Sequence, residues 1–412
     1  MKKDLSNLWL PFNVLLIIIC ITPSGLHADD AHYKNMLIGE RAATMGGSYV
    51  AVSDDSTGCY YNPGGIAYAV GDSLSGSGNV MHQMKTVYHQ AIGTKDWVRD
   101  SEALVPNYFS VLKKFKSYSF CFSYVVPEAF IEHQDLVFEN LGTIKKYYQS
   151  LHSEDITYLM GPSAAMSLGE DISIGLTLYY HYRSFMRQQH YFLESTDGSY
   201  QVFYESKKQR EDGLMPKIGA QWSPLNLLTV GVALDQTILF NAPYQADLSY
   251  HSTDNSTGTA SLATTMNRTK TELKRNMPLH IAFGAAYFPT PSQLYTFDID
   301  YYQAQEKGRV DVINFSGGTE YYINPTNAVR LGLFTNYTNL PQPDSSTTSP
   351  YEYIDIYGAS FGYTSYSSSS SLTFGTIYTS GSGKAWLYEG LTESRKMTRD
   401  SLTFLFSASS NM

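Results

Sequence analysis

The sequence is poor in cysteine, in charge and, beyond its first residues, in long apolar runs. Three cysteines among 412 residues are too few for a disulfide scaffold. Only 16% of the residues are charged, and the net charge of −9 comes without a basic cluster, which argues against nucleic-acid binding. After residue 22 no segment reaches the ~18 consecutive apolar residues of a membrane-spanning helix. We therefore expect either an exported soluble protein or a membrane protein built from strands.

Residues 1–28 predict a secretory signal peptide. Lys2 and Lys3 give a positive start, residues 14–22 an apolar core, and Ala28 a small residue at the cleavage position. A lipoprotein signal would acylate Cys20, but the large residue before it disfavours that processing. We expect this segment to be removed after export.

Most of the remaining chain alternates between large apolar residues and small or polar ones. Within residues 171–182, Ile172 and Ile174 are separated by Ser173 and followed by Gly175. A period of two is the period of a strand, because successive side chains leave a sheet on opposite faces. Small and polar residues on the second face suit a wet lumen, so the pattern is typical of a lipid-embedded barrel. The inward positions by this parity include Gly175, Gly231, Asp235, Gly284, Asp298, Asp300 and Gly332.

Past residue 72 the alternation divides into fourteen segments, an even number as single-chain bacterial barrels require. Short turns alternate with longer connections at 127–154, 241–276 and 340–352. In a soluble β-sandwich nothing requires short and long connections to alternate, whereas a transmembrane barrel has short periplasmic turns at one end and long external loops at the other. We predict an all-β fold, a 14-stranded antiparallel transmembrane β-barrel over residues 73–412 in the bacterial outer membrane. The expected strands are 73–89, 105–113, 116–126, 155–169, 171–190, 200–223, 227–240, 277–288, 294–305, 310–323, 328–339, 353–366, 369–386 and 397–407.

Residues 29–72 do not alternate and are rich in glycine. The segment is too apolar for a disordered leader and too short for a core of its own. We therefore predict a plug, or hatch, folded inside the lumen. Asn62 to Gly65 are expected to form a tight turn, since proline lacks an amide donor and glycine allows unusual backbone angles. The residues assigned to the hatch motif are Gly46, Gly47, Asn62, Pro63, Gly64 and Gly65.

The run Gly-x-Arg-Ala-x-x-Met-Gly-Gly from Gly39, followed by Asn-Pro-Gly-Gly at 62–65, resembles the hatch of the FadL/TodX class of long-chain fatty-acid transporters. That class consists of fourteen-stranded outer-membrane barrels whose lumen is blocked by such a hatch. The resemblance implies hydrophobic small molecules or fatty acids, outer-membrane lipid and the barrel-insertion machinery as partners. The chain departs from the class at Gly64, where alanine is usual. It also departs at its end, because barrels of this class usually end in an aromatic residue, whereas here the last aromatic residue, Phe406, is followed by a polar tail.

Four cations are expected in the lumen, where the carboxylate of an amphiphile would need a charge partner. The planar fork of arginine suits a carboxylate best, so an arginine is the expected anchor. In the alternative, these cations pair with lumen acids and only hold the barrel and hatch together. The cations are Arg183, Lys217, His280 and Arg330, with Arg183 and Arg330 as the expected anchors, and the acids are Asp235, Asp298 and Glu320.

The stretch 130–148 is more apolar than an exposed loop needs. It could be a loop helix that caps the barrel mouth, a landing surface for a hydrophobic ligand, or both, because exposed apolar patches mark binding sites. The candidate ligand contacts are Phe130, Ile131, Leu136, Phe138 and Leu141.

Enzyme and cofactor motifs are missing. The sequence has no phosphate-binding Gly-x-x-x-x-Gly-Lys-Ser/Thr loop and no Gly-x-Ser-x-Gly nucleophile turn. His181, His190 and His280 are scattered and lack the spacing of metal ligands. Asp298 and Asp300 share a strand face, but paired acids in a wet lumen usually hold basic residues or water. We predict no catalytic residue, no metal, no cofactor and no nucleic-acid partner.

The predicted function is passive, ligand-gated outer-membrane transport of hydrophobic compounds, with long-chain fatty acids as cargo. The cargo would leave either by movement of the hatch or through a gap in the wall. The alternative is a structural or secretion-associated barrel that binds protein partners through its external loops.

Cys59 lies in the hatch and Cys121 on the inward face of a strand. A bridge between them would tether the hatch to the wall if their Cα atoms lay within about 7 Å, but two separate buried thiols are expected.

Overall fold

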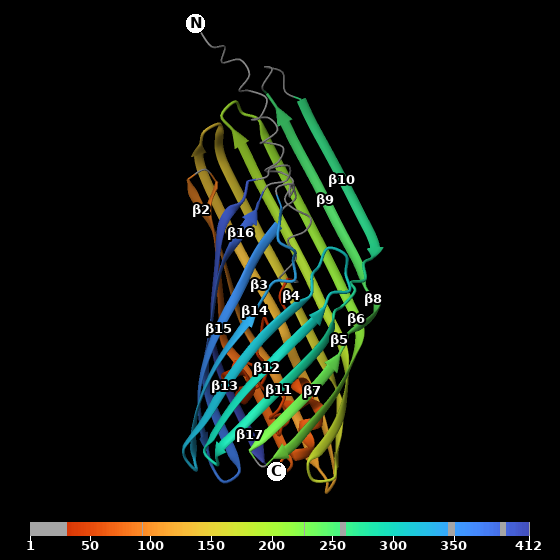
Figure 1. The fold of residues 1–412 in the computed structure, drawn as a ribbon. Helices are drawn as coiled ribbons and strands as arrows, with labels where there is room; N and C mark the ends of the chain where they lie inside the picture. Colours follow the sequence, from red (N-terminus) through yellow and green to blue (C-terminus); the bar gives the residue numbers. More distant parts are fainter. Residues whose placement is uncertain are drawn as a thin grey trace.

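The computed structural model describes residues 31–92, 94–225, 227–255, 261–344, 351–387 and 393–411, so the predicted leader and Cys20 lie outside the described residues. Within these ranges the strands form one closed antiparallel barrel of fourteen strands, as predicted (Figure 1). Strand β1 (Ser73–Ile92) pairs with both β2 (Lys95–Lys114) and the last strand, β17 (Arg395–Asn411), which closes the barrel.

Two of the fourteen barrel strands are interrupted. Strands β7 (Leu228–Asp235), β8 (Ile238–Asn241) and β9 (Pro243–Asp254) all pair with β6 and follow one path along it. Strands β10 (Ser261–Glu272) and β11 (Leu279–Thr290) continue one another beside β9 and β7. The other strands are β3 (Tyr118–Leu141), β4 (Ile144–Leu168), β5 (Ile172–Ser195), β6 (Tyr200–Leu225), β12 (Gln293–Gln303), β13 (Val312–Asn324), β14 (Asn327–Asn336), β15 (Tyr351–Tyr366) and β16 (Ser370–Trp386).

The two faces of the wall follow the predicted parity. Leu176 and Phe283 point outward and are 51% and 53% exposed, whereas their inward neighbours Thr177 and Ala282 are buried. An outer surface of exposed Phe, Leu, Ile and Tyr over a polar inner surface is the arrangement that lipid contact requires. The described part of the chain contains no helix with the length and hydropathy of a membrane span.

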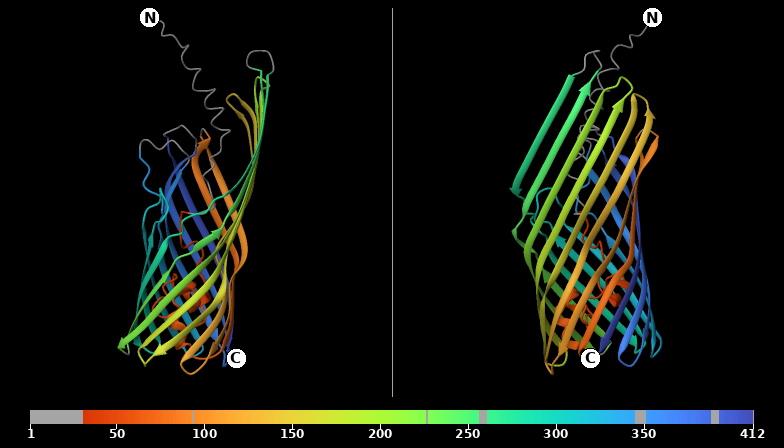
Figure 2. Two further views of the ribbon diagram at one scale, coloured as in Figure 1. Left: turned by 90° about the vertical axis from the view of Figure 1, so that its right-hand side faces the viewer. Right: turned by 180° about the vertical axis from the view of Figure 1, so that it is seen from behind.

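Two of the three long connections are strands rather than loops. Residues 127–154 continue β3 and β4 to a tight turn at Gly142 and Thr143, and most of 241–276 forms β9 and β10. The prediction of a capping helix at 130–148 was therefore wrong. The alternation persists there, but polar residues fill the outer face because it lies beyond the apolar belt. Figure 2 shows these strands rising past the rest of the barrel at one end.

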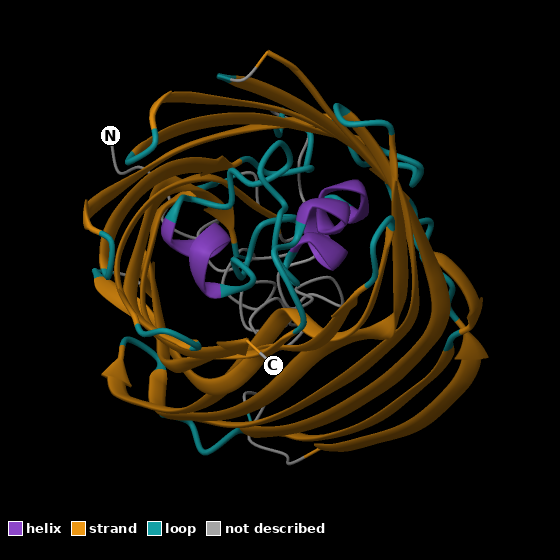
Figure 3. Ribbon diagram, turned by 90° about the horizontal axis from the view of Figure 1, so that it is seen from below, coloured by secondary structure: helices purple, strands orange, loops and turns teal. Residues whose placement is uncertain are grey.

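The hatch segment lies inside the ring of strands, where Figure 3 shows its helices. It contains α2 (Glu40–Thr44), α3 (Gly58–Tyr61) and the 3-10 helix η1 (Pro63–Tyr68). Met45 and Tyr49 pack in one apolar cluster with Ala286 and Leu294 of the wall. The hatch therefore supplies the core that the lumen would otherwise lack.

Cys59 and Cys121 form a disulfide, so the expectation of two separate thiols was wrong. Their Cα atoms are 6.9 Å apart, and both residues belong to the apolar cluster between the hatch and β3. The sequence could not show this proximity, because it depends on how α3 docks against the wall. The bridge ties the hatch covalently to the barrel.

The disulfide predicts that the mature protein has no free thiol. Maleimide-polyethylene glycol added under denaturing, non-reducing conditions should leave its electrophoretic mobility unchanged. After reduction, two additions are expected, and a Cys121→Ser variant should show one addition without reduction. Labelling of both cysteines in the unreduced parent would contradict the bridge.

Candidate functional site

The hatch lies so close to the wall that several inward positions can only be glycine. A Cβ atom on Gly318 would lie 2.6 Å from the Cβ of Met45, and one on Gly284 would lie 2.8 Å from the Cβ of Val50. Such approaches require the hatch to move. The same conflict with hatch atoms arises at Gly175, Gly219, Gly231, Gly332, Gly362 and Gly375.

The Asn62 to Gly65 segment joins the hatch to β6. The Asn62 side chain accepts a hydrogen bond from the Gly64 amide at 3.0 Å and donates to the carbonyls of Val50 and Ala220 at 2.7 and 2.9 Å. Pro63 begins η1, where its missing amide costs nothing. A Cβ on Gly64 would lie 2.9 Å from the Ala220 Cα atom. Close packing, rather than an unusual backbone angle, therefore explains this glycine.

The Gly46-Gly47 pair does use the freedom of glycine. Both residues have positive φ, 69° and 77°, which residues with a Cβ rarely adopt. The turn directs the next backbone amides at the wall, where Asp298 accepts from Tyr49 N at 2.6 Å and from Val50 N at 2.9 Å. One of the two paired acids thus holds the hatch backbone.

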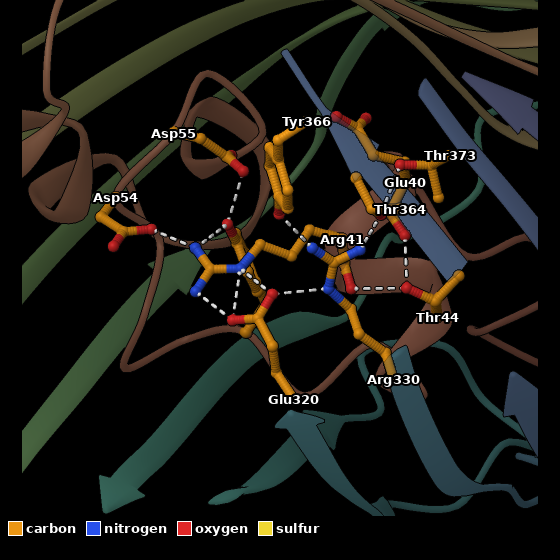
Figure 4. Close-up of polar contacts among 11 residues, drawn as sticks. Glu40, Arg41, Thr44, Asp54, Asp55, Glu320, Arg330, Thr364, Tyr366 and Thr373 are labelled. Atoms are coloured by element: carbon orange, nitrogen blue, oxygen red, sulfur yellow. Dashed lines mark hydrogen bonds and ion pairs between the residues drawn. The ribbon is translucent and has the colours of Figure 1, made fainter. Parts of the chain in front are cut away.

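A buried ion cluster, shown in Figure 4, joins α2 to β13 and β14. Arg41 donates to the Glu320 carboxylate at 2.7 Å through Nη2 and to Asp54 at 2.6 Å through Nη1. Glu320 also accepts from Arg330 Nε at 2.7 Å. Removing one partner of the fully buried Glu320–Arg330 pair costs ~3–5 kcal/mol, because a charge is left uncompensated, whereas Asp54 is 42% exposed and contributes less. The cluster therefore fixes the hatch opposite the disulfide.

Both arginines expected to anchor a ligand are engaged in buried ion pairs. Arg330 donates to Thr364 and Tyr366 as well as to Glu320. Arg183 is 1% exposed and bonds Asp155 and Glu211, and Glu211 is shared with Arg275. Both arginines therefore follow the alternative that the sequence left open, in which the lumen cations pair with lumen acids.

A cavity of about 360 Å³ lies at the turn end of the barrel, between the hatch and β15–β17, and is lined by Glu40, Arg41 and Arg330.

Burial, together with the charge of Asp55, raises the pKa of Glu40. A carboxyl with a raised folded pKa contributes stability that is complete below its unfolded pKa and is lost as pH rises through the folded value. This group therefore stabilises the hatch most in acid.

A second cavity, of about 210 Å³, lies on the other side of the hatch, and we call it the upper cavity. Lys217 and His280, two of the predicted cations, line it. Its apolar and aromatic lining includes Met36, Leu37, Tyr60, Leu159, Met215 and Tyr302. Rings, thioethers and charges together suit a ligand with an apolar body and one polar group.

The charged side chains of the upper cavity form a chain of alternating sign. His280 bridges Asp235 and Asp300 at 2.9 and 3.1 Å, Lys217 pairs with Asp235 at 2.7 Å, and hatch Lys34 pairs with Asp300. Above them the ring of Tyr33 stacks on Tyr302 at 4.2 Å, and Tyr302 stacks on His280 at 4.3 Å. Sequence reasoning did not identify Lys34 and Tyr33, because nothing local marks them as cavity residues.

The upper cavity reaches a defect in the wall. Strands β2 and β3 pair at Ser101 with Glu132 and again at Tyr108 with Val125, and the ladder is interrupted between those pairs. Pro106 and Pro127 lie in the interrupted stretches, where each removes an amide donor. Apolar residues fill this gap, and Pro127 also lines the cavity. They are Met36, Ala103, Val105, Val126 and Ala129.

The predicted apolar contacts of 130–148 divide between two places. Phe138 packs with Tyr147, Tyr191 and Phe203 on the inner face of the projecting strands. Ile131 packs beside the apolar gap cluster, and Phe130 and Leu136 are half-buried. The side chain of Leu141 lies outside the described part of the structure.

The close packing generates a matched pair of variants on β13. Gly318→Val should displace the hatch, at a cost of ~1–3 kcal/mol for overpacking, and should raise the leak of small polar solutes. Gly317→Val is the control, because Gly317 faces outward and its nearest potential contact is 3.6 Å away. Equal single-channel leak of the two variants in planar bilayers would contradict the fit described here.

No protein-family model and no curated protein matches the sequence, but solved structures match almost the whole chain. A Pseudomonas aeruginosa FadL homologue is 13% identical, with a TM-score of 0.64 over 92% of this chain and 100% of that one. The Pseudomonas putida toluene transporter TodX is 12% identical, with a TM-score of 0.60 over 92% and 100%. The CymD monoaromatic hydrocarbon channel is 14% identical, with a TM-score of 0.59 over 91% and 98%. The resemblance inferred from the hatch motif is thus confirmed in architecture, and the chain has the fold of the FadL-like channels.

Proposed function

We propose that this protein is a bacterial outer-membrane channel for the passive passage of hydrophobic small molecules. The observation that carries the proposal is the upper cavity, which lies against a tethered hatch and opens toward an apolar defect in the wall. The channels of the same fold are named for toluene and monoaromatic hydrocarbons, which supports the same class of cargo here.

The size of the upper cavity favours a compact cargo. A protein cavity of ~150 Å³ holds benzene, whereas drug-sized ligands occupy ~300–1,000 Å³. At about 210 Å³ the upper cavity accommodates one substituted aromatic ring better than a long acyl chain. Long-chain fatty acids remain the alternative cargo, and they would require the cavity to enlarge.

Lys217 and His280 are better placed than the two arginines to meet a polar group. Both line the upper cavity, and Lys217 Nζ lies 5.2 Å from the centre of the Tyr60 ring. Arg183 and Arg330 are not part of the upper cavity's lining, whereas Lys217 and His280 line it while they stay paired with Asp235 and Asp300. We therefore assign contact with a hydroxyl or anionic substituent to Lys217 and His280.

The apolar gap between β2 and β3 is the proposed exit. A cargo leaving through the wall displaces the side chain of Met36 but leaves α2 and α3 in place, where the Arg41 cluster and the disulfide hold them. The residues around the gap are small or flexible, so a ring could displace them without breaking an ion pair.

The alternative function, a barrel that binds protein partners, is supported by the exposed strand β10. It forms the outer edge of the projecting sheet in Figure 2, with Leu262 and Met266 70% and 75% exposed. An exposed sheet edge can accept a strand from another protein. Stable co-purification with an exported protein, lost on deleting β9 and β10, would favour this function.

Uptake in a host that lacks its own channel tests the proposal. Cells that express the parent should take up labelled cresol faster than empty-vector cells and faster than they take up oleate. Ala129→Phe should lower the cresol rate about fivefold or more, because filling the gap costs at least ~1 kcal/mol. The control is Ala164→Phe, at an outward-facing position on β4. Both variants must first be shown to insert equally.

Each outcome decides a separate point. Uptake of neither compound above the empty-vector rate contradicts transport, and uptake of oleate alone would establish the fatty-acid alternative. Unchanged cresol uptake in Ala129→Phe would contradict the route through the wall.

A further inference from the structure

Two histidines face each other on the outer surface of the projecting hairpin formed by β3 and β4. His133 and His152 are direct cross-strand partners in the antiparallel register, each nine positions from the Gly142-Thr143 turn. Glu154 is two residues from His152 on the same strand and therefore on the same face. Ile131, its partner across the strands, completes the patch.

The three polar side chains converge. The Nδ1 atoms of His133 and His152 are 2.5 Å apart, and the ring centres are 4.1 Å apart. Nε2 of His152 lies 3.3 Å from a carboxylate oxygen of Glu154. One candidate ligand atom from each residue lies within 4.8 Å of the others. Two imidazole nitrogens that face each other must share a proton or a cation, since two lone pairs repel each other.

The cluster lies on the wet side of the apolar belt. The outward rings of Tyr124, Tyr158 and Tyr182 form a row across β3, β4 and β5, with neighbouring centres 6.1 and 5.9 Å apart. Aromatic rows of this kind mark a membrane interface. His152 lies six residues beyond Tyr158 toward the long end of the barrel, or ~20 Å along the strand. The cluster is thus open to solutes outside the membrane.

We propose that His133, His152 and Glu154 form a site for a borderline divalent metal ion, with zinc as the best match. Two imidazoles and one carboxylate are the ligand set of open zinc sites, and zinc accepts them at distances of ~2.0–2.2 Å. Calcium and magnesium prefer oxygen ligands, so two nitrogen donors select against them. The candidate ligand atoms lie within 4.8 Å of one another, which is close enough for the three to surround one ion. A fourth position stays open to water or to an external ligand.

Binding would link the two strands of the hairpin beyond the membrane. An ion held by residues of both strands binds only the paired hairpin, and so raises the hairpin's stability with the logarithm of the ion concentration above the dissociation constant. Strand β3 also forms one side of the wall gap, but the proposed site does not depend on transport.

Isothermal titration calorimetry of the full mature barrel in detergent, prepared without a histidine tag, tests the site with zinc chloride alone. We expect one zinc per chain, and a loss of affinity of at least about tenfold in both His133→Ala and His152→Ala. The control is His190→Ala, an outward histidine on neighbouring β5 that is not part of the cluster. Its affinity should equal that of the parent.

Cobalt substitution gives a second measurement that does not depend on affinity alone. Cobalt bound to the parent should give the visible absorption of a four-coordinate site, and this should disappear in the double variant H133A/H152A. Absence of saturable zinc binding in the parent would overturn the proposal. So would equal zinc affinity in the parent and the H133A/H152A variant.

Discussion

The contact between the hatch backbone and the inward glycines of the wall is the constraint on which the rest of the structure depends. Side chains larger than hydrogen at Gly318 or Gly332 would occupy the space of hatch atoms. This contact brings Arg41 within reach of Glu320 and the amides of Tyr49 and Val50 within reach of Asp298. Arg41 and Asp298 therefore keep these partners only while the hatch occupies its position in the lumen.

A hatch held in this way is a fixed wall of the upper cavity rather than a removable stopper. The disulfide at Cys59 and the cluster at Arg41 attach it to opposite parts of the barrel. Pulling it out would expose buried charges in addition to breaking a covalent bond. The upper cavity and the gap beside Pro127 offer a path that leaves these links intact. In the proposed channel, selectivity depends on the cavity, and release depends on the small apolar residues of the gap.

Parity in the sequence was sufficient to predict the barrel, its strand number and the inward glycines, because the apolar belt imposes a strict period of two. It was less informative beyond the belt. Strands β9 and β10 were taken for a loop since no apolar face distinguishes them there. The sequence placed Arg183 and Arg330 in the lumen but could not show that these arginines form ion pairs with Asp155 and Glu320.

The remaining features depend on contacts between distant segments. The stack of Tyr33 on Tyr302 and the bridge from Cys59 to Cys121 join residues that are far apart in the chain. The facing pair of His133 and His152 could have been found from the sequence if the turn at Gly142 had been recognised. Hairpin register follows directly from the position of a two-residue turn.

The central claim is that cargo passes beside a tethered hatch, and cresol uptake with and without the tether tests it most directly. Initial uptake rates should be compared between the parent, with its bridge verified on non-reducing gels, and the double variant Cys59→Ser/Cys121→Ser, each normalised to inserted barrel. The account predicts equal rates, because the hatch does not leave its place during passage. A several-fold faster uptake in the variant, reproduced by reducing the parent, would contradict it.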